Sequence, residues 1–261
     1  MPPHNSAEAR VLDNVLQARA SIAEREHFDR LVNNQGESWW GNATPAGIWR
    51  LQRRASLIAS ELAQFTDPLV LEIGCGVGTF TRYVLEELPL LRLVGCDVSP
   101  RSIEAARHHN SRNRRAIFEV GDVAALKYSD ETFDAVIGNS VLHHLPLELS
   151  FAEIFRVLKV GGLIWFSEPN MMNPQNALER NVRFIGRMLQ NSENETAFIR
   201  WRLARKMVEC GFRDVSVQPY DFLHPAIPRA MVRPVDRLAR FLETVPVFRE
   251  VSGSLLIRGC R

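Results

Sequence analysis

The sequence is poor in cysteine, and its cysteines do not have the spacing of a metal or disulfide site. The four are Cys75, Cys96, Cys210 and Cys260. Zinc-binding cysteines come in C-x-x-C pairs, and small secreted folds carry a dense set of disulfides. We therefore expect no metal and no disulfide. Cys75 lies inside a glycine turn, where we expect it to fill space rather than to act as a nucleophile.

Long apolar runs are also missing, and we expect no export leader. No run approaches the roughly 18 apolar residues of a membrane helix, and residues 1–5 have neither a basic nor an apolar region. The net charge is only +2, and no basic patch is interleaved with aromatic residues. We expect a cytoplasmic enzyme with no nucleic-acid partner and no stable membrane insertion. The 261 residues suffice for one α/β domain and a helical cap.

The most informative segment is a glycine-rich turn between a predicted strand and a predicted helix. It reads Val70-Leu71-Glu72-Ile73-Gly74-Cys75-Gly76-Val77-Gly78-Thr79. The apolar residues predict a buried parallel strand, and the glycines let the backbone approach a ligand closely at a helix N-terminus. Nucleotide, flavin and sulfonium-cofactor proteins share such turns. The dinucleotide fingerprint requires glycine or alanine at its sixth position, where this chain has Thr79.

Two further carboxylates follow predicted strands. Asp97 ends the strand expected at 91–96, where a carboxylate can accept hydrogen bonds from a ribose diol. Asp122 follows the strand expected at 116–120 and can accept from an adenine amino group. Glu72 lies within an apolar strand, where an unpaired charge is costly. We expect loop amides or waters near the ligand to hold Glu72, or otherwise an internal basic partner.

With these segments and four others in register, the chain resembles the class I S-adenosylmethionine-dependent methyltransferases of the small-molecule branch, such as ubiquinone-pathway O-methyltransferases. The other matching segments are Phe133-Asp134-Ala135-Val136-Ile137, Leu142-His143-His144-Leu145, Leu158-Lys159-Val160-Gly161-Gly162 and Cys210-Gly211-Phe212-Arg213-Asp214-Val215. The resemblance covers residues 69–258, roughly, and does not extend to the methyl acceptor.

The resemblance implies a Rossmann-like α/β fold. We expect a seven-stranded, mostly parallel sheet with helices on both faces and the last strand antiparallel beside the fifth. The strands are expected at 69–73, 91–96, 116–120, 133–138, 162–168, 215–218 and 254–257. The helices are expected at 8–32, 48–65, 79–88, 100–109, 148–158 and 197–210.

Residues 1–66 are expected to form an N-terminal helical cap and residues 67–261 the methyltransferase domain. Within that domain, 169–200 are expected to form a lid and 220–250 a tail helix. Pro234 is expected to start the tail helix, with one apolar face toward the domain. That face comprises Val235, Leu238, Ala239 and Leu242.

The cofactor implied by the resemblance is S-adenosylmethionine. The residues expected to bind it are Glu72, Gly74, Cys75, Gly76, Gly78, Asp97, Val98, Asp122, Val123, Asn139 and Trp40. Val98 is expected to pack on the adenine, and the backbone at Asn139 to meet the ammonium group. In the related O-methyltransferases an aromatic pair and a later arginine close over the cofactor, and Trp40 with Arg53 or Arg54 stands in comparable order. The alternative is an ordinary apolar contact and a solvated arginine face.

Methyl transfer is an in-line displacement, for which the protein holds the acceptor in place and excludes water. An oxygen acceptor also needs a base within hydrogen-bond reach. The candidates are His143, His144 and Glu168, which follow the fourth and fifth strands. Adjacent histidines face different ways, so at least one is expected to be structural. Catalysis by proximity, without a dedicated base, is the alternative.

The acceptor is expected to be a small molecule, with oxygen as the favoured atom. Methylases of base amino groups carry an Asn/Asp-Pro-Pro-aromatic motif after the fourth strand, where this chain has Asn139-Ser140-Val141-Leu142. The alternatives are a carbon or nitrogen acceptor on a metabolite or lipid-linked substrate, a nicotinamide-dependent oxidoreductase, and a non-catalytic module that binds S-adenosylmethionine.

The lid and the tail are expected to form the acceptor pocket, and Met171 and Met172 are candidates to line it. Arg233, Arg237 and Arg240 of the tail are expected on a solvated face. Contact with an anionic membrane, a lipid-linked substrate or an acidic carrier protein is the alternative.

Overall fold

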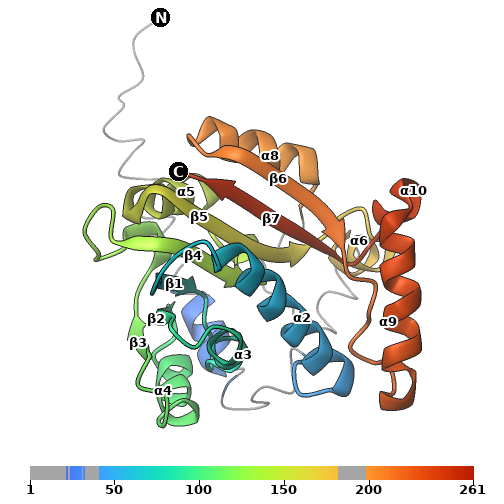
Figure 1. The fold of residues 1–261 in the computed structure, drawn as a ribbon, viewed down its shortest axis with the longest axis horizontal. Helices are drawn as coiled ribbons and strands as arrows, with labels where there is room; N and C mark the ends of the chain where they lie inside the picture. The colour runs from blue at the N-terminus through green and yellow to red at the C-terminus, as the bar shows by residue number, and fades with distance from the viewer. Residues whose placement is uncertain (1–21, 23, 31, 33–40, 182–197) are drawn as a thin grey trace, which may run out of the picture.

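The computed structural model describes residues 22, 24–30, 32, 41–181 and 198–261 (Figure 1). Trp40, most of the helix predicted over 8–32 and most of the predicted lid lie outside these residues. Of the first predicted helix, residues 24–30 are described, and they are helical. The described helices contain none that is long and apolar enough to cross a membrane.

One seven-stranded sheet runs through the molecule, with the strand order β3-β2-β1-β4-β5-β7-β6. The strands are β1 (Leu69–Ile73), β2 (Arg92–Asp97), β3 (Ala116–Val120), β4 (Phe133–Asn139), β5 (Leu158–Pro169), β6 (Arg213–Tyr220) and β7 (Ser254–Cys260). The pairs among β1 to β5 are parallel, and β7 lies antiparallel between β5 and β6. The predicted sheet is therefore confirmed, including its antiparallel last strand.

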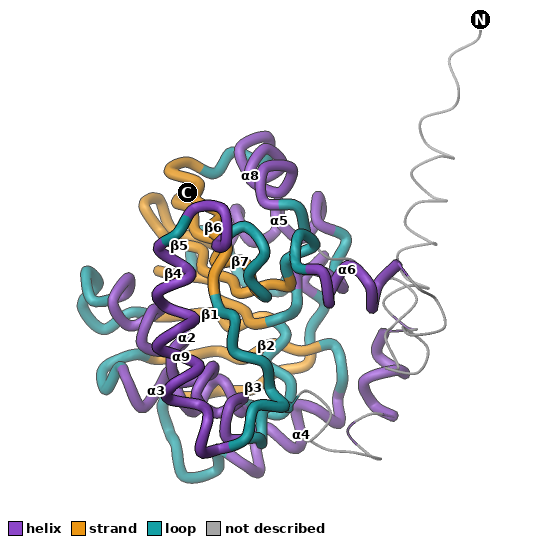
Figure 2. Tube along the Cα trace, turned by 90° about the vertical axis from the view of Figure 1, so that its right-hand side faces the viewer, coloured by secondary structure: helices purple, strands orange, loops and turns teal. Residues whose placement is uncertain are grey.

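Helices cover both faces of the sheet (Figure 2). They are α2 (Pro45–Leu62), α3 (Thr79–Glu87), α4 (Pro100–His109), α5 (Leu147–Val157), α6 (Pro174–Asn181), α8 (Arg200–Glu209), α9 (Arg229–Thr244) and α10 (Pro246–Arg249). Two short 3-10 turns, η2 (Val123–Ala125) and η3 (Leu142–His144), follow β3 and β4.

The two faces of the sheet have separate apolar cores because neighbouring residues of a strand point to opposite sides. Val70 of β1 packs with α2 and α3 through residues such as Ile58 and Val84. Leu71, the next residue along, packs instead into the core that contains Phe151 of α5 and Met207 of α8. A strand buried on both faces accounts for the uninterrupted apolar run that predicted it.

Several element boundaries differ from the sequence prediction, and three of the differences have an identifiable local feature. Helix α2 begins at Pro45 rather than at residue 48, because the Thr44 hydroxyl caps it by accepting from the Gly47 N–H at 3.0 Å. Strand β5 begins at Leu158 and passes through Gly161 in a left-handed conformation (φ +78°). Pro234 lies inside α9 rather than at its start.

The antiparallel arrangement of β7 determines where the long β6–β7 connection lies. Strand β6 ends and β7 begins at the edge of the sheet where the parallel strands have their carboxyl ends. Residues 221–253, with α9 and α10, therefore lie at that edge, at the right of Figure 1. Ligands of open α/β sheets bind at this edge, where the strand order reverses between β1 and β4.

Candidate active site

The glycine turn after β1 is closed on one side and open on the other. Gly74 has a φ of +62°, and an added Cβ there would lie 2.3 Å from Cγ2 of Val141. Gly76 has a φ of +52°, and an added Cβ there would meet no atom of the described residues within 4 Å. Gly78, at +78°, is the N-cap of α3. The turn thus presents bare backbone toward open space at Gly76, as a closely approaching ligand requires.

Asp97, at the tip of β2, binds the turn directly. Its Oδ2 accepts from the Gly76 N–H and its Oδ1 from the Ser99 N–H, both at 2.9 Å. Burial raises the pKa of Asp97, although these two N–H donors favour the charged form. A carboxylate has about four acceptor positions, so two remain beyond these backbone bonds.

Glu72 has a different partner from those expected. Its side chain is buried, and the Thr81 hydroxyl of α3 donates to Oε2 at 2.5 Å. Burial raises the pKa of Glu72 to about 8. Among the described residues, neither a loop amide nor a basic side chain bonds to Glu72, so those two expectations are wrong. The partner lies on the neighbouring helix because Glu72 points to the same face of the sheet as Val70.

The tip of β3 lies beside Asp97, because Asp97 and Val120 are paired across β2 and β3. Asp122 follows that tip, and its Oδ1 accepts from the Ala124 N–H at 2.9 Å, which caps η2. Val123 is buried, and Val98 is half-buried. The predicted adenosine-binding residues therefore come together along one edge of the sheet.

Strained backbone marks the tip of β4. Ser140 has a φ of +56°, and its N–H donates to the Ser167 carbonyl at 2.7 Å. Non-glycine residues held in this conformation cost about 1–3 kcal/mol and cluster at functional sites. The preceding residue, Asn139, accepts from Nη1 of Arg54 at 2.7 Å.

Arg54 belongs to a buried polar network that the sequence did not predict. Its Nη2 also donates to Oδ2 of Asp221 at 3.3 Å, and Arg50 donates to the same oxygen at 2.7 Å. Burial raises the pKa of Asp221, but the charges of Arg50 and Arg54 outweigh it and bring the pKa below its ordinary value. The sequence contained one indication of this role for Asp221. Like Asp97, it is an acidic residue at the end of a strand.

Arg53 is paired with a tail residue. Its two terminal nitrogens donate to both carboxylate oxygens of Glu243 in α9, at 2.8 and 2.6 Å. The alternative of a solvated arginine face is thus wrong for Arg53 and for Arg54. The two arginines connect α2 with the tail and with the tips of β4 and β6.

The structure brings His143 and Glu168 together. Nδ1 of His143 lies 2.7 Å from Oε2 of Glu168, and both side chains are buried. Oε1 of Glu168 accepts from the Val141 and Leu142 N–H groups, each at 2.8 Å. With its lone pairs engaged in this way, the Glu168 carboxylate orients the imidazole and the β4 loop.

His144 has a different partner from His143, although the two rings lie side by side with centroids 4.0 Å apart. Nδ1 of His144 is 3.4 Å from Oε2 of Glu24, and its ring meets the edge of Phe28. The helix at 24–30 therefore packs at this corner of the site. We predicted that the adjacent histidines face different ways. The 3-10 turn η3 instead brings the two rings together.

Cys75 is buried, and burial raises the pKa of its thiol well above the ordinary value. A protonated buried thiol is a poor nucleophile. Among the described residues, no group of three or more His, Cys, Asp or Glu side chains could hold a metal ion.

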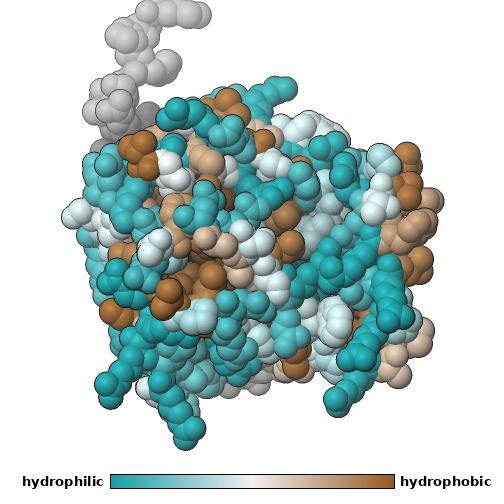
Figure 3. Space-filling view, viewed as in Figure 1, coloured by the Kyte–Doolittle hydropathy of each residue, from teal (hydrophilic) through white to brown (hydrophobic). Residues whose placement is uncertain are grey.

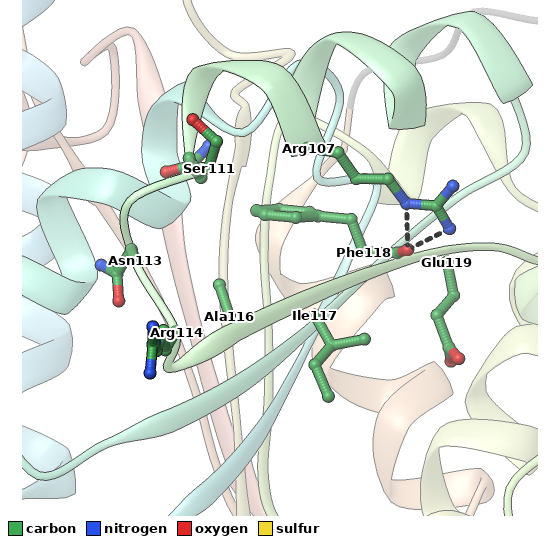
Figure 4. Close-up of a pocket in the computed structure, with 9 residues that line it drawn as sticks. Arg107, Ser111, Asn113, Arg114, Ala116, Ile117, Phe118 and Glu119 are labelled. Atoms are coloured by element: carbon green, nitrogen blue, oxygen red, sulfur yellow. Dashed lines mark hydrogen bonds between the residues drawn. The ribbon is translucent and has the colours of Figure 1, made fainter.

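A surface recess of about 390 Å³ lies elsewhere, between α4 and β3 (Figure 4). Arg107 closes one side of it by donating to the Phe118 carbonyl at 2.7 and 3.0 Å. The recess extends past Asn113 and Arg114, before the start of β3, and so lies away from the carboxyl edge. It is separate from the candidate site.

Comparison with known proteins agrees with this geometry. Residues 71–166 match the family model described as a methyltransferase domain. The chain is 28% identical to 2-methyl-6-phytyl-1,4-hydroquinone methyltransferase of Synechocystis over 72% of this chain and 63% of that protein. It is 34% identical to malonyl-[acyl-carrier protein] O-methyltransferase of Herminiimonas arsenicoxydans over 44% of this chain and 43% of that protein. The chain thus spans less than two thirds of these relatives.

Another relative is covered more fully. Erythromycin 3''-O-methyltransferase of Saccharopolyspora erythraea is 29% identical over 77% of this chain and 72% of that protein. Among solved structures, an S-adenosylmethionine-dependent methyltransferase of Thermotoga maritima aligns with a TM-score of 0.59 and 20% identity, over 90% of this chain and 98% of that chain. At this identity, the structural match shows the fold alone.

Proposed function

We propose that this chain, which belongs to the class I S-adenosylmethionine-dependent methyltransferases, transfers a methyl group to a hydroxyl of a small-molecule acceptor. The observation that carries the proposal is the open glycine turn at Gly76 with Asp97 bound to it. Most relatives named above are methyltransferases of small or carrier-linked molecules, two of them O-methyltransferases.

The residues at the edge fit S-adenosylmethionine. The turn at Gly74–Gly78 leaves room for the methionine part against bare backbone, and Asp97 has two acceptor positions left for the ribose hydroxyls. Asp122 with Val123 suits the adenine, and Val98 can pack on its ring. The backbone at Asn139 suits the ammonium group. The bound cofactor supplies a methyl group activated by positively charged sulfur.

His143 is the proposed base for the acceptor hydroxyl. The tautomer that donates from Nδ1 to Glu168 keeps Nε2 as a proton acceptor, and the carboxylate stabilises the imidazolium that forms. Glu168 is then a positioning residue rather than the base, since its oxygens accept from two backbone N–H groups and face His143. His144, next to Glu24, is proposed to close the site against water together with the N-terminal helix.

We also propose the division of the chain that the sequence predicts. Residues 1–66 would be the cap, 67–261 the methyltransferase domain, 169–200 the lid, and 220–250 the tail. The contacts of Arg53 and Arg54 support a cap that is anchored to the tail and to the sheet edge. Trp40 keeps its proposed place above the cofactor, outside the described residues.

Transfer of a labelled methyl group tests the proposal. The protein is incubated with S-adenosylmethionine labelled on its methyl group and with panels of phenols, sugar hydroxyls, carboxylates and amines. Fragmentation of the products identifies the methylated atom. A product labelled on a hydroxyl oxygen supports the proposal, whereas label only on carbon or nitrogen would refute the acceptor, and no transfer to any panel would refute the activity.

The variant His143→Ala distinguishes catalysis by a base at His143 from catalysis by proximity alone. We expect kcat to fall by roughly 10²–10⁴, with S-adenosylmethionine affinity unchanged and the acidic limb of the pH–rate profile lost. His108→Ala, an exposed histidine on α4, is the matched control. An unchanged kcat and pH profile in His143→Ala would show that no base at this position takes part.

A further inference from the structure

The exposed side of α9 and α10 is unusually apolar. Leu238 and Phe241 of α9 are 57% and 63% exposed, and Val247 of α10 is 78% exposed. Met231 of α9 and Phe248 of α10 are also exposed, at 50% and 53%. Figure 3 shows the corresponding hydrophobic colour along its right-hand edge, where Figure 1 places these helices. Contiguous exposed apolar surface of this kind marks an interaction site.

These side chains are not the face by which α9 packs on the domain. The buried residues of α9 are Val232, Asp236 and Ala239, and Val232 packs with Ala46 and Leu223. The prediction that Leu238 faces the domain is therefore wrong. Leu238 directly precedes the buried Ala239 but lies on the exposed side of the helix. Contacts with α2 determine which face of α9 packs on the domain, and the sequence pattern does not reveal them.

Positive charge borders the apolar surface. Arg233 and Arg237 are exposed, and Arg237 lies one helical turn before Phe241. Helix α9 has two acidic residues, and both are engaged on the packed side. Asp236 accepts from Arg240 at 2.8 Å, and Glu243 accepts from Arg53. The outward side of α9 thus combines large apolar side chains with arginines.

We propose that this surface, the α9 face, binds the surface of an anionic lipid membrane. It comprises Met231, Arg233, Arg237, Leu238, Phe241, Val247 and Phe248. A helix lying in the interface buries its apolar side chains among the acyl chains while its arginines meet anionic head groups. A second copy packed through the same face about a two-fold axis would bring the arginines of both copies together without an acidic partner, which disfavours a dimer.

The α9 face lies at the same edge of the sheet as the candidate active site. Residues 221–253 lie at the carboxyl edge of the sheet, and Arg53 and Glu243 tie α9 to the cap. A membrane held by the α9 face therefore lies beside the candidate active site. This inference concerns a surface outside the cofactor site and does not depend on the identity of the acceptor.

Vesicle flotation tests the inference. The full chain is mixed with vesicles of phosphatidylcholine alone or with about one third phosphatidylglycerol. We expect flotation with the anionic vesicles and its loss as salt rises from about 0.1 M to about 1 M, where the screening length falls from ~10 Å to ~3 Å. Absence of flotation with anionic vesicles would overturn the proposal.

Two paired variants locate the contact. Arg233→Gln with Arg237→Gln should weaken partitioning about thirtyfold, since each arginine near an anionic surface contributes about fivefold. The matched control is Arg202→Gln with Arg205→Gln, two exposed arginines of α8. If the α8 variant loses binding and the α9 variant keeps it, the α9 face is not the membrane site.

A second pair tests the apolar part. Leu238→Ser with Phe241→Ser should reduce partitioning at least tenfold, while Trp201→Ser with Val208→Ser, side chains of α8 that are 51% and 58% exposed, should not. Sedimentation of the same proteins checks self-association. A wild-type dimer that Leu238→Ser with Phe241→Ser converts to a monomer would assign the face to a second copy and refute the membrane proposal.

Discussion

Glu72→Gln is expected to stabilise the fold in neutral and mildly alkaline solution. Glu72 is 1% exposed, and burial raises its pKa to about 8 from an ordinary value of 4.5. The substitution keeps the shape of the side chain and an oxygen for the Thr81 hydroxyl, and it removes the titration. The comparison therefore isolates the cost of holding an ionisable group at this position.

The sign and size follow from proton linkage. Below about pH 4.5 the carboxyl is protonated in the folded and the unfolded chain, and its full contribution to stability is present. Between pH 4.5 and pH 8 the unfolded chain loses the proton and the folded chain keeps it, so the free energy of unfolding falls by about 1.4 kcal/mol per pH unit. Above about pH 8 the loss is complete, at roughly 5 kcal/mol, since each unit of pKa difference corresponds to about 1.4 kcal/mol.

Urea unfolding of the cofactor-free protein measures this effect. Wild type and Glu72→Gln are compared from pH 5 to pH 8.5, roughly, so that all other titrating groups cancel in the difference. We expect the advantage of Glu72→Gln to grow steadily across this range. Glu86→Gln, whose side chain is 62% exposed on α3, is the control and should show no such trend. Parallel curves for wild type and Glu72→Gln would refute the raised pKa and the buried position of Glu72.

Three other changes test separate parts of the site. Asp97→Ala should weaken S-adenosylmethionine binding at least about tenfold, since charge-assisted hydrogen bonds contribute roughly 1.5–3 kcal/mol each; unchanged calorimetric binding would contradict its role. Met171→Ala with Met172→Ala should raise the KM for the acceptor and leave cofactor affinity near wild type; equal loss of both affinities would place the pair at the cofactor instead. Arg53→Gln should destabilise the protein by about 1–3 kcal/mol in thermal unfolding by breaking the pair with Glu243; an unchanged Tm would contradict this.

The strands of the sheet could be predicted because each can be recognised from the pattern of its own residues. Apolar runs followed by glycine or aspartate fix β1, β2 and β3, and only their order in space required the resemblance to a family. The position of β7 between β5 and β6 is a long-range property that no periodicity contains. Strand β5 was predicted too short because Gly161 and Gly162 suggest a turn, although the strand continues through them.

The cofactor edge was predicted better than its surroundings. Asp97 and Gly76 are 21 residues apart, and a strand tip and a glycine turn can be expected to meet. The bonds from Arg54 to Asn139 and Asp221 span 85 and 167 residues, so only the folded chain reveals them. The same holds for α9, where Pro234 suggested a helix start. Its missing N–H costs one internal hydrogen bond, which packing of the preceding turn against Ala46 and Leu223 offsets.

The proposed methyl transfer requires S-adenosylmethionine, so cofactor binding at the glycine turn is the central claim. Calorimetric titration with S-adenosylhomocysteine of wild type, Gly76→Val and Gly161→Val tests it most directly. Both glycines have positive φ and open space beside them, but Gly161 lies at the opposite end of the sheet. We expect Gly76→Val to abolish binding and Gly161→Val to retain it. Normal binding by a folded Gly76→Val protein would contradict the assignment of the site.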